Sequence, residues 1–487
     1  MRVVYGVNFF WRRCIFLLLS LLSLLLTGQT APAQPSLDYD VFKARVQPIF
    51  LNKRPGNARC ISCHTSGGAA YLQRLSPGQT TWDEEQSQKN FDRVKRLVVP
   101  GAPDKSRLLL HPLAVEAGGD EFHGGGKHFM SRDNPEWQVL AAWVKGEKPA
   151  ALRTQTAAGD SAGDPKSVAP RTSGVRIVQT NSAGDAVSLI DPATNKVVAE
   201  IKNIEVNHGA AAAPDGSRLY VTDEADSTLD FVDAKTLAVG KRVPLSGHPN
   251  NVSISKDGRR VYVAIAQAPG AVDVVDTASA TLAKTIPIEG AGHNTYVTPD
   301  GKFVVAGSVA GKSLTVIDAR TENVVWAMKF EGGVRPMTFE KKPDGSTGRM
   351  FVQISDFHGF AVVDFDTHKE ITRVTLPDPP GQEKNTQGIQ GSPSHGIGIT
   401  PDGKVLWATS KWYHYVAAYS MPDLKPLGIV QVGHEPDWLT FTPDSKMVYV
   451  ACAGSNYVSA VDVKSLREIT RIAVGQVPKR NITAVLQ

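Results

Sequence analysis

Short runs of alternating apolar and polar residues, separated by tight turns, fill the chain from about Val175 to its end. The segment LIDPATNKVV recurs as FVDAKTLAV, VVDTASATLAKT, VIDARTENVV, VVDFDTHKEI, YSMPDLKPL and AVDVKSLREI. The aligned positions, mostly 42 or 43 residues apart, are Asp191, Asp233, Asp276, Asp318, Asp364, Ser420 and Asp462. A second pattern, such as APDGSRLYVT, follows these copies and carries an Asp-Gly turn. Alternation with a period of two indicates half-buried strands, and Asp-Gly marks the turns between them.

This repeat predicts an all-β propeller, because its length accommodates four strands per copy. Seven copies predict seven blades over residues 174–487. The final segment VPKRNITAVLQ has the pattern of an innermost strand but no blade follows it. The segment VRIVQTNS, which starts at Val175, has the pattern of a second strand but no innermost strand precedes it. We therefore expect the two ends to pair in one blade and close the ring.

Residues 37–146 have a different pattern, which predicts a small all-α domain. The segment LDYDVFKARVQPIFLN has the apolar spacing of a short helix, and DNPEWQVLAAWVKG has that of a closing helix. We expect Asn134 to be the N-cap of the closing helix and Pro135 its first residue. Residues 147–173 are rich in Ala, Gly, Ser, Thr and Pro and predict a flexible linker.

Between these two helices lies CISCH, the spacing that attaches a c-type haem. In such a site Cys60 and Cys63 form thioethers with the porphyrin, and His64 is the proximal ligand of the iron. A zinc site is the weaker interpretation because no second CxxC completes it, and no thioredoxin-like βαβ pattern supports a redox dithiol. We therefore predict one covalent haem c. Cys452 remains as a single cysteine without assigned chemistry.

The first 33 residues have the pattern of a cleaved secretory signal peptide. Three arginines precede an apolar run from Cys14 to Leu26, and a small-residue site follows at Ala31-Pro32-Ala33. This run is shorter than the roughly 20 residues that span a bilayer, so we expect no membrane span in the mature chain. The formal net charge of +5 is too small for a nucleic-acid-binding surface. We predict a periplasmic protein, since c-type haem attachment in bacteria occurs after export.

The second axial ligand of the iron has four candidates in one loop: His111, His123, His128 and Met130. The region, with VVPGAPDKSRLL before the loop, resembles the small cytochrome domains common in planctomycetes. In that family the ligand lies about twenty residues before the tryptophan of the last helix, here Trp143, and is often methionine. This resemblance implies His123 as the distal ligand, with Met130 as the alternative.

A ring of polar residues is predicted at one end of the propeller channel. Seven residues before the aspartate of the turn, at the start of the innermost strand, lie His208, Asn250, His293, His395 and Asp437. The fourth blade carries two extra residues and offers Arg335, and the C-terminal strand offers Arg480. Seven of the eight propeller histidines fall on this face, and the long insertion LPDPPGQEKNTQGIQGSPS leads into His395. Imidazoles favour a transition metal or haem iron, but a polar, water-filled channel mouth has the same composition.

The repeats resemble the YVTN family of bacterial propellers, whose name Tyr220-Val221-Thr222-Asp223 nearly spells. A cytochrome c domain joined to such a propeller resembles the cytochrome cd nitrite reductases and their haem-d1-domain relatives. In that group the propeller, which has eight blades, holds a second haem.

These observations favour a periplasmic electron-transfer protein whose propeller docks a redox partner protein or holds a second cofactor. The first alternative is a redox enzyme with a second haem or metal at the propeller mouth, where the candidates are His208, His293, Arg335, His395 and Asp437. The second alternative is a propeller scaffold that binds a protein or peptide. No nucleophile or acid/base pair identifies a catalytic residue.

Overall fold

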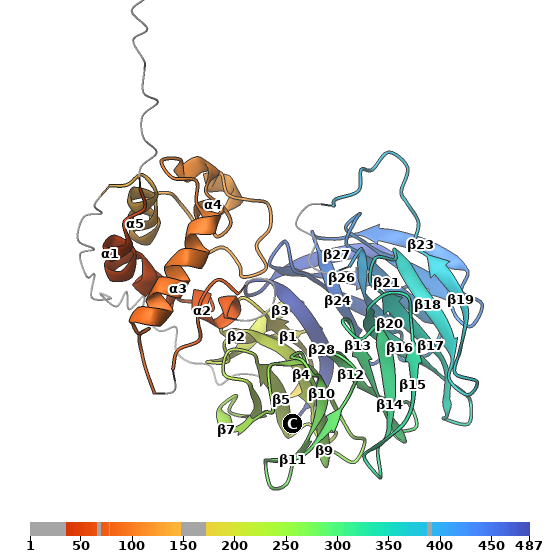
Figure 1. Ribbon diagram of the computed structural model, residues 1–487. Helices are drawn as coiled ribbons and strands as arrows, with labels where there is room; N and C mark the ends of the chain where they lie inside the picture. Colours follow the sequence, from red (N-terminus) through yellow and green to blue (C-terminus); the bar gives the residue numbers. More distant parts are fainter. Residues whose placement is uncertain (1–35, 66–69, 77, 148–171, 387–391) are drawn as a thin grey trace, which may run out of the picture.

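The computed structural model describes residues 36–65, 70–76, 78–147, 172–386 and 392–487. The predicted signal peptide and nearly all of the predicted linker lie outside these residues. The described part forms a helical unit, residues 36–147, and a propeller, residues 172–487, which lie side by side (Figure 1). No described helix is long and apolar enough to cross a membrane.

The propeller has seven four-stranded antiparallel sheets in the described part of the chain, which confirms the predicted number of blades. The first sheet contains β28 (Pro478–Leu486), β1 (Gly174–Asn181), β2 (Ala186–Asp191) and β3 (Lys196–Lys202). The second contains β4 (Asn207–Ala212), β5 (Arg218–Asp223), β6 (Thr228–Asp233) and β7 (Val239–Pro244). The third contains β8 (Pro249–Ile254), β9 (Arg260–Ile265), β10 (Ala271–Asp276) and β11 (Thr281–Pro287). The fourth contains β12 (Gly292–Val297), β13 (Phe303–Ser308), β14 (Ser313–Asp318) and β15 (Asn323–Lys329).

The remaining three sheets complete the ring. They contain β16 (Val334–Lys341), β17 (Thr347–Ile354), β18 (Gly359–Asp364) and β19 (Lys369–Thr375); β20 (Ser394–Ile399), β21 (Val405–Ser410), β22 (Tyr415–Ser420) and β23 (Pro426–Gln431); and β24 (Pro436–Phe441), β25 (Met447–Cys452), β26 (Tyr457–Asp462) and β27 (Arg467–Ala473). The ring is closed as the sequence predicts, because β28 pairs with β1 from Gly174 opposite Leu486 to Asn181 opposite Pro478.

The repeated aspartate of the sequence pattern stabilises the turn between the third and fourth strands of a blade. Asp233 accepts hydrogen bonds from the backbone N–H groups of Lys235 and Thr236 at 3.1 and 2.8 Å. Asp318 does the same for Arg320 and Thr321 at 3.1 and 2.7 Å. An aspartate that binds its own turn replaces backbone hydrogen bonds lost where the strand ends. The regular spacing of the repeat therefore has a local physical cause.

The helical unit is built around one apolar core. Its helices are α1 (Tyr39–Val41), which continues through two further helical turns (Phe42–Val46 and Gln47–Phe50), α2 (Cys60–His64), α3 (Glu84–Val94), α4 (Arg107–Leu110) and α5 (Pro135–Val144). The side chain of Asn134 caps α5 by accepting from the backbone N–H groups of Glu136 and Trp137, and Pro135 is the first helical residue, as predicted. The first and last helices pack together, with the rings of Phe42 and Trp143 5.5 Å apart.

The helical unit is attached to the propeller through two of its own segments. Before α2, the backbone N–H of Ala58 donates to the carbonyl of Ala183 at 2.8 Å. The guanidinium of Arg59 binds the carboxylate of Glu205 at 2.8 Å. In the loop that contains His123, Lys127 and the side chain of Gln476 exchange two hydrogen bonds of 2.6 and 3.0 Å. These propeller residues all lie in loops on the face that carries the predicted polar ring.

Candidate functional site

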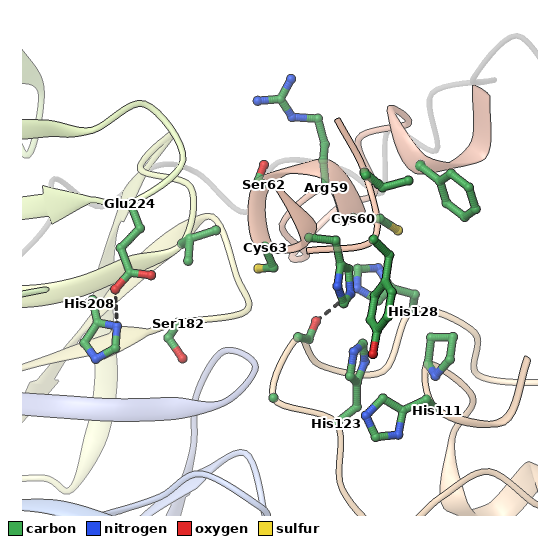
Figure 2. A pocket seen from close by; sticks show the side chains of 18 of the residues that line it. Arg59, Cys60, Ser62, Cys63, His111, His123, His128, Ser182, His208 and Glu224 are labelled. Atoms are coloured by element: carbon green, nitrogen blue, oxygen red, sulfur yellow. Dashed lines mark hydrogen bonds and ion pairs between the residues drawn. The ribbon is translucent and has the colours of Figure 1, made fainter. Parts of the chain in front are cut away.

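A cavity of about 510 Å³ lies between the helical unit and the mouth of the propeller. Residues of both parts line it, and Figure 2 shows Cys63 opposite Glu224, His208 and Ser182 across this space. Its volume falls in the range of roughly 300–1,000 Å³ that is typical of cofactor and ligand pockets. The CISCH segment and the polar ring, which the sequence treats as separate sites, therefore face one space.

The helical side of the cavity contains all three residues of the attachment motif. Cys60, Cys63 and His64 lie on the short helix α2 and line the cavity together with Leu72 and Phe129. Burial raises the pKa of the Cys63 thiol to about 12 and also raises that of Cys60. A redox dithiol needs a thiolate with a lowered pKa, so this environment disfavours that alternative.

The distance between the rings of His64 and His123 matches that between two imidazoles that share one metal ion. Their centres are 6.1 Å apart and their planes differ by 13°. With metal–nitrogen bonds of roughly 2.0 Å on opposite sides of a metal, two imidazole centres are about 6 Å apart. Since both histidines line the cavity with Cys60 and Cys63, these residues are the ones that would hold a haem there.

The hydrogen bonding of His123 also suits a ligand. Its Nδ1 lies 2.6 Å from the carbonyl oxygen of Gly126, so Nδ1–H donates and Nε2 keeps its lone pair. Gly125 keeps the space beside this nitrogen open, because a Cβ there would lie 3.1 Å from Nε2 and 3.0 Å from Cε1. Burial, together with the neighbouring His111, holds the pKa of His123 well below its usual value, so the ring is neutral at pH 7.

Of the other candidates for the distal position, Met130 is placed least favourably. Met130 is 70% exposed and does not line the cavity, so its thioether faces away from the site. His111 also lines the cavity, and the contact of its Nδ1 with Asp120 at 2.8 Å leaves its Nε2 available, as in His123. His128 is buried, and its Nε2 lies 3.0 Å from the carbonyl of Gly125, which leaves Nδ1 without a hydrogen-bond partner.

The propeller side of the cavity contains every residue of the ring derived from the Asp-Gly turns: His208, Asn250, His293, Arg335, His395, Asp437 and Arg480. Six of them are the second residue of an innermost strand, and in β28 Arg480 is the third. Pairing with the second strand is irregular near this position in every blade. Irregular strand ends redirect side chains, which explains why both Lys479 and Arg480 of β28 reach the cavity.

Sequence reasoning missed a second tier of polar residues at the mouth. Glu224, Lys411 and Ser355 each follow directly after the second strand of a blade, and so does Ser182. Glu224 and Ser182 line the cavity, and Ser355 accepts a hydrogen bond from Nε of Arg335 at 2.8 Å. The same alignment, continued past the Asp-Gly turn to the end of the following strand, finds these positions. Lys479 was missed although it adjoins Arg480.

Both acids that line the mouth are held by cations or imidazoles. The carboxylate of Glu224 is 2.5 Å from Nδ1 of His208 and 3.6 Å from Nε2 of His248. Burial would raise the pKa of Glu224, but these two histidines outweigh it and lower the pKa to about 2.

The second acid, Asp437, belongs to a buried chain of charges. Its Oδ1 binds Nζ of Lys411 at 2.5 Å, and Lys411 lies 3.5 Å from Glu435. Nδ1 of His395 is 2.8 Å from the backbone oxygen of Asp437.

The three mouth histidines do not converge on one point. The rings of His293 and His395 are 5.5 Å apart and perpendicular, and His208 is paired with Glu224. Among the described residues, no group of three or more His, Cys, Asp or Glu side chains is close enough to hold a metal ion. Burial holds the pKa of His293 and of His395 well below the usual value, so both rings are neutral at pH 7.

Comparisons with known proteins bear on the propeller fold. No protein-family model and no curated protein matches the chain. Hydrazine synthase of Kuenenia stuttgartiensis is similar in structure, with a TM-score of 0.51 and 22% identity over 58% of this chain and 91% of that one. A putative 6-phosphogluconolactonase of Bacteroides fragilis has a TM-score of 0.53 and 18% identity over 66% of this chain and 100% of that one. Dihydro-heme d1 dehydrogenase NirN has a TM-score of 0.49 and 15% identity over 72% of this chain and 86% of that one. At these identities the first two similarities concern the fold alone.

Proposed function

We propose that this chain is a periplasmic redox protein in which one haem c, held by Cys60, Cys63, His64 and His123, exchanges electrons with a molecule in the propeller mouth. The observation that carries the proposal is the single cavity that contains both the CISCH residues and the polar ring. A haem with two imidazole ligands supplies a one-electron couple. The chain's own residues hold its iron, exclude water from its face and present neutral imidazoles beside it.

The position of the helical unit supports one of the roles considered for the propeller. A partner protein that docks at the mouth would meet the helical unit, which already contacts the surrounding loops through Arg59 and Lys127. A small redox partner inside the cavity needs no such displacement. We therefore favour a redox enzyme that acts on a small molecule over a platform for a partner protein. The outer surface of the helical unit remains the place where a periplasmic partner protein would exchange electrons.

The attachment of haem is the first test of the proposal. We expect the full-length chain, matured in a host that attaches haem c, to stain for haem on a denaturing gel and to carry the mass of one haem. The double substitution Cys60→Ala/Cys63→Ala should abolish both signals. Cys452→Ala is the matched control, because Cys452 is buried in the propeller at the end of β25 and should leave both signals unchanged. A wild-type protein without bound haem would contradict the proposal.

A further inference from the structure

Two adjacent cations at the propeller mouth form no ion pair within the described part of the chain. Lys479 and Arg480 lie at the start of β28 and line the cavity, and Arg480 is only 2% exposed. Among the described residues, no carboxylate oxygen lies within 4.0 Å of either side chain. The guanidinium of Arg480 donates to Oδ1 of Asn250 at 2.5 Å and lies over the ring of Trp438, 4.4 Å from its centre. Its Nη1 can also reach the amide oxygen of Asn294 at 3.2 Å.

These contacts leave Nε of Arg480 buried without a hydrogen-bond partner. They also involve only neutral groups, which satisfy hydrogen bonds but do not compensate a charge. A buried charge without a counter-charge is strongly unfavourable. Burial lowers the pKa of Arg480 to about 10, so the side chain still carries its charge at pH 7.

The two acids at the mouth act on these cations only across more than 4.0 Å, because each acid has a closer partner. Glu224 is bound by His208, and Asp437 is bound by Lys411. The propeller's share of the cavity lining contains three cations, Arg335, Lys479 and Arg480, and these two acids. Water alone would fill a polar channel mouth, but water does not supply a negative charge. The cavity therefore favours an anion beside Lys479 and Arg480.

We propose that the cavity binds a small carboxylate or oxyanion at Lys479 and Arg480, on the side of the cavity that His293 and His395 also line. Arg480 offers its unpartnered Nε–H, and a guanidinium and an ammonium together suit a planar or tetrahedral oxyanion. The inference rests on the proposed function, in which this anion is the small molecule that reacts at the mouth. A carboxylate at this position has a second source, which is a propionate group of the haem itself.

Anion binding to the holoprotein tests the site directly. Sodium formate and sodium sulfate are titrated calorimetrically at constant ionic strength, with sodium chloride as the balancing salt. We expect saturable binding of at least one of these anions to the wild type, and at least a ten-fold weakening in Lys479→Gln and in Arg480→Gln. Arg259→Gln removes one charge from an exposed turn at the other end of the propeller and should bind like the wild type. If Arg480→Gln fails to fold, Arg480→Lys and Lys479→Gln replace it.

The reduction potential of the haem distinguishes the two sources of the anion. If the wild type binds neither salt but Lys479→Gln and Arg480→Gln shift the potential relative to the wild type and Arg259→Gln, the anion is a haem propionate. If neither salt binds and neither variant shifts the potential, the proposed anion site is wrong. Haem staining is a separate readout, so a chain that binds formate or sulfate but carries no haem contradicts the proposed function and leaves the anion site standing.

Discussion

His123 and Gly125 show how single residues shape the candidate haem site. The bond from Nδ1 of His123 to the carbonyl of Gly126 fixes the orientation and tautomer of the ring. The missing side chain of Gly125 leaves the space that the other ring nitrogen faces. A ligand histidine needs both conditions, and one short loop supplies them.

Substitution of Gly125 tests this arrangement. In Gly125→Ala the new Cβ would lie 3.0 Å from Cε1 of His123, so the ring must move by a few tenths of an ångström. We expect a larger fraction of haem with an open distal position, measured as carbon monoxide binding to the reduced protein. His123→Ala should bind carbon monoxide completely. Gly240→Ala in β7, where a Cβ meets only the Phe231 carbonyl oxygen at 3.9 Å, is the control. A wild type that binds as readily as His123→Ala would exclude His123 as a ligand.

At the scale of elements, the start of α2 is held by the loop between β3 and β4. The carboxylate of Glu205 accepts from the backbone N–H of Arg59, which precedes the first turn of α2, and from its guanidinium. Lys53 adds a more distant contact with Glu205 at 3.9 Å. One acidic side chain of the propeller thus fixes the element that carries Cys60, Cys63 and His64.

Loss of this carboxylate should loosen α2 while the propeller stays folded. For Glu205→Gln we expect the free energy that holds α2 against the propeller to fall by about 1–3 kcal/mol, since a partly exposed ion pair and its hydrogen bonds are broken. Hydrogen exchange of residues 58–64 should become at least five-fold faster, with no change in β5 or β6. Glu200→Gln on the exposed strand β3 is the matched control. Equal exchange in all three proteins would show that Glu205 does not hold α2.

The same contact should depend on pH. Burial would raise the pKa of Glu205, but its hydrogen bonds from Arg59 outweigh burial and lower the pKa below the ordinary value of 4.5. The carboxylate form is therefore favoured in the folded protein, and its stabilisation is complete above pH 4.5 and is lost as the pH falls below that value. Hydrogen exchange at residues 58–64 should accelerate over this acidic range in the wild type and not in Glu205→Gln.

At the scale of the whole molecule, one strand joins the end of the chain to the first blade. β28 is the innermost strand of a sheet whose other strands, β1 to β3, come more than 270 residues earlier. It buries Ala484 and Leu486 and also carries Lys479 and Arg480 into the cavity. Closure of the ring and the charge of the mouth therefore depend on the same strand.

Removal of this strand should destabilise the entire propeller. Deletion of residues 478–487 exposes the edge of β1 and removes buried apolar side chains, so we expect the free energy of unfolding to fall by about 3 kcal/mol or more. Thermal and denaturant unfolding followed by circular dichroism measure this change. Deletion of Gln487 alone, which lies beyond β28, is the control. Unchanged unfolding after the longer deletion would mean that the ring does not need β28 for its stability.

The sequence by itself determined those features that depend on local, repeated chemistry. Turns bound by aspartates such as Asp233 recur at nearly constant spacing, so the number of blades, the closing strand and the residues at the mouth follow from counting along the chain. The CISCH spacing and the capped helix at Asn134 are equally local. Each of these patterns specifies its structure within a few residues, or within one repeat.

Only the tertiary structure decided how the two parts of the chain meet. Arg59 and Glu205 are 146 residues apart, and Lys127 and Gln476 are 349 apart. No periodicity relates such positions, because their contact depends on the shapes and charges of two folded surfaces. The tertiary structure therefore places the CISCH helix over the polar ring and joins their spaces into one cavity. It also leaves Lys479 and Arg480 without an ion pair to any described carboxylate.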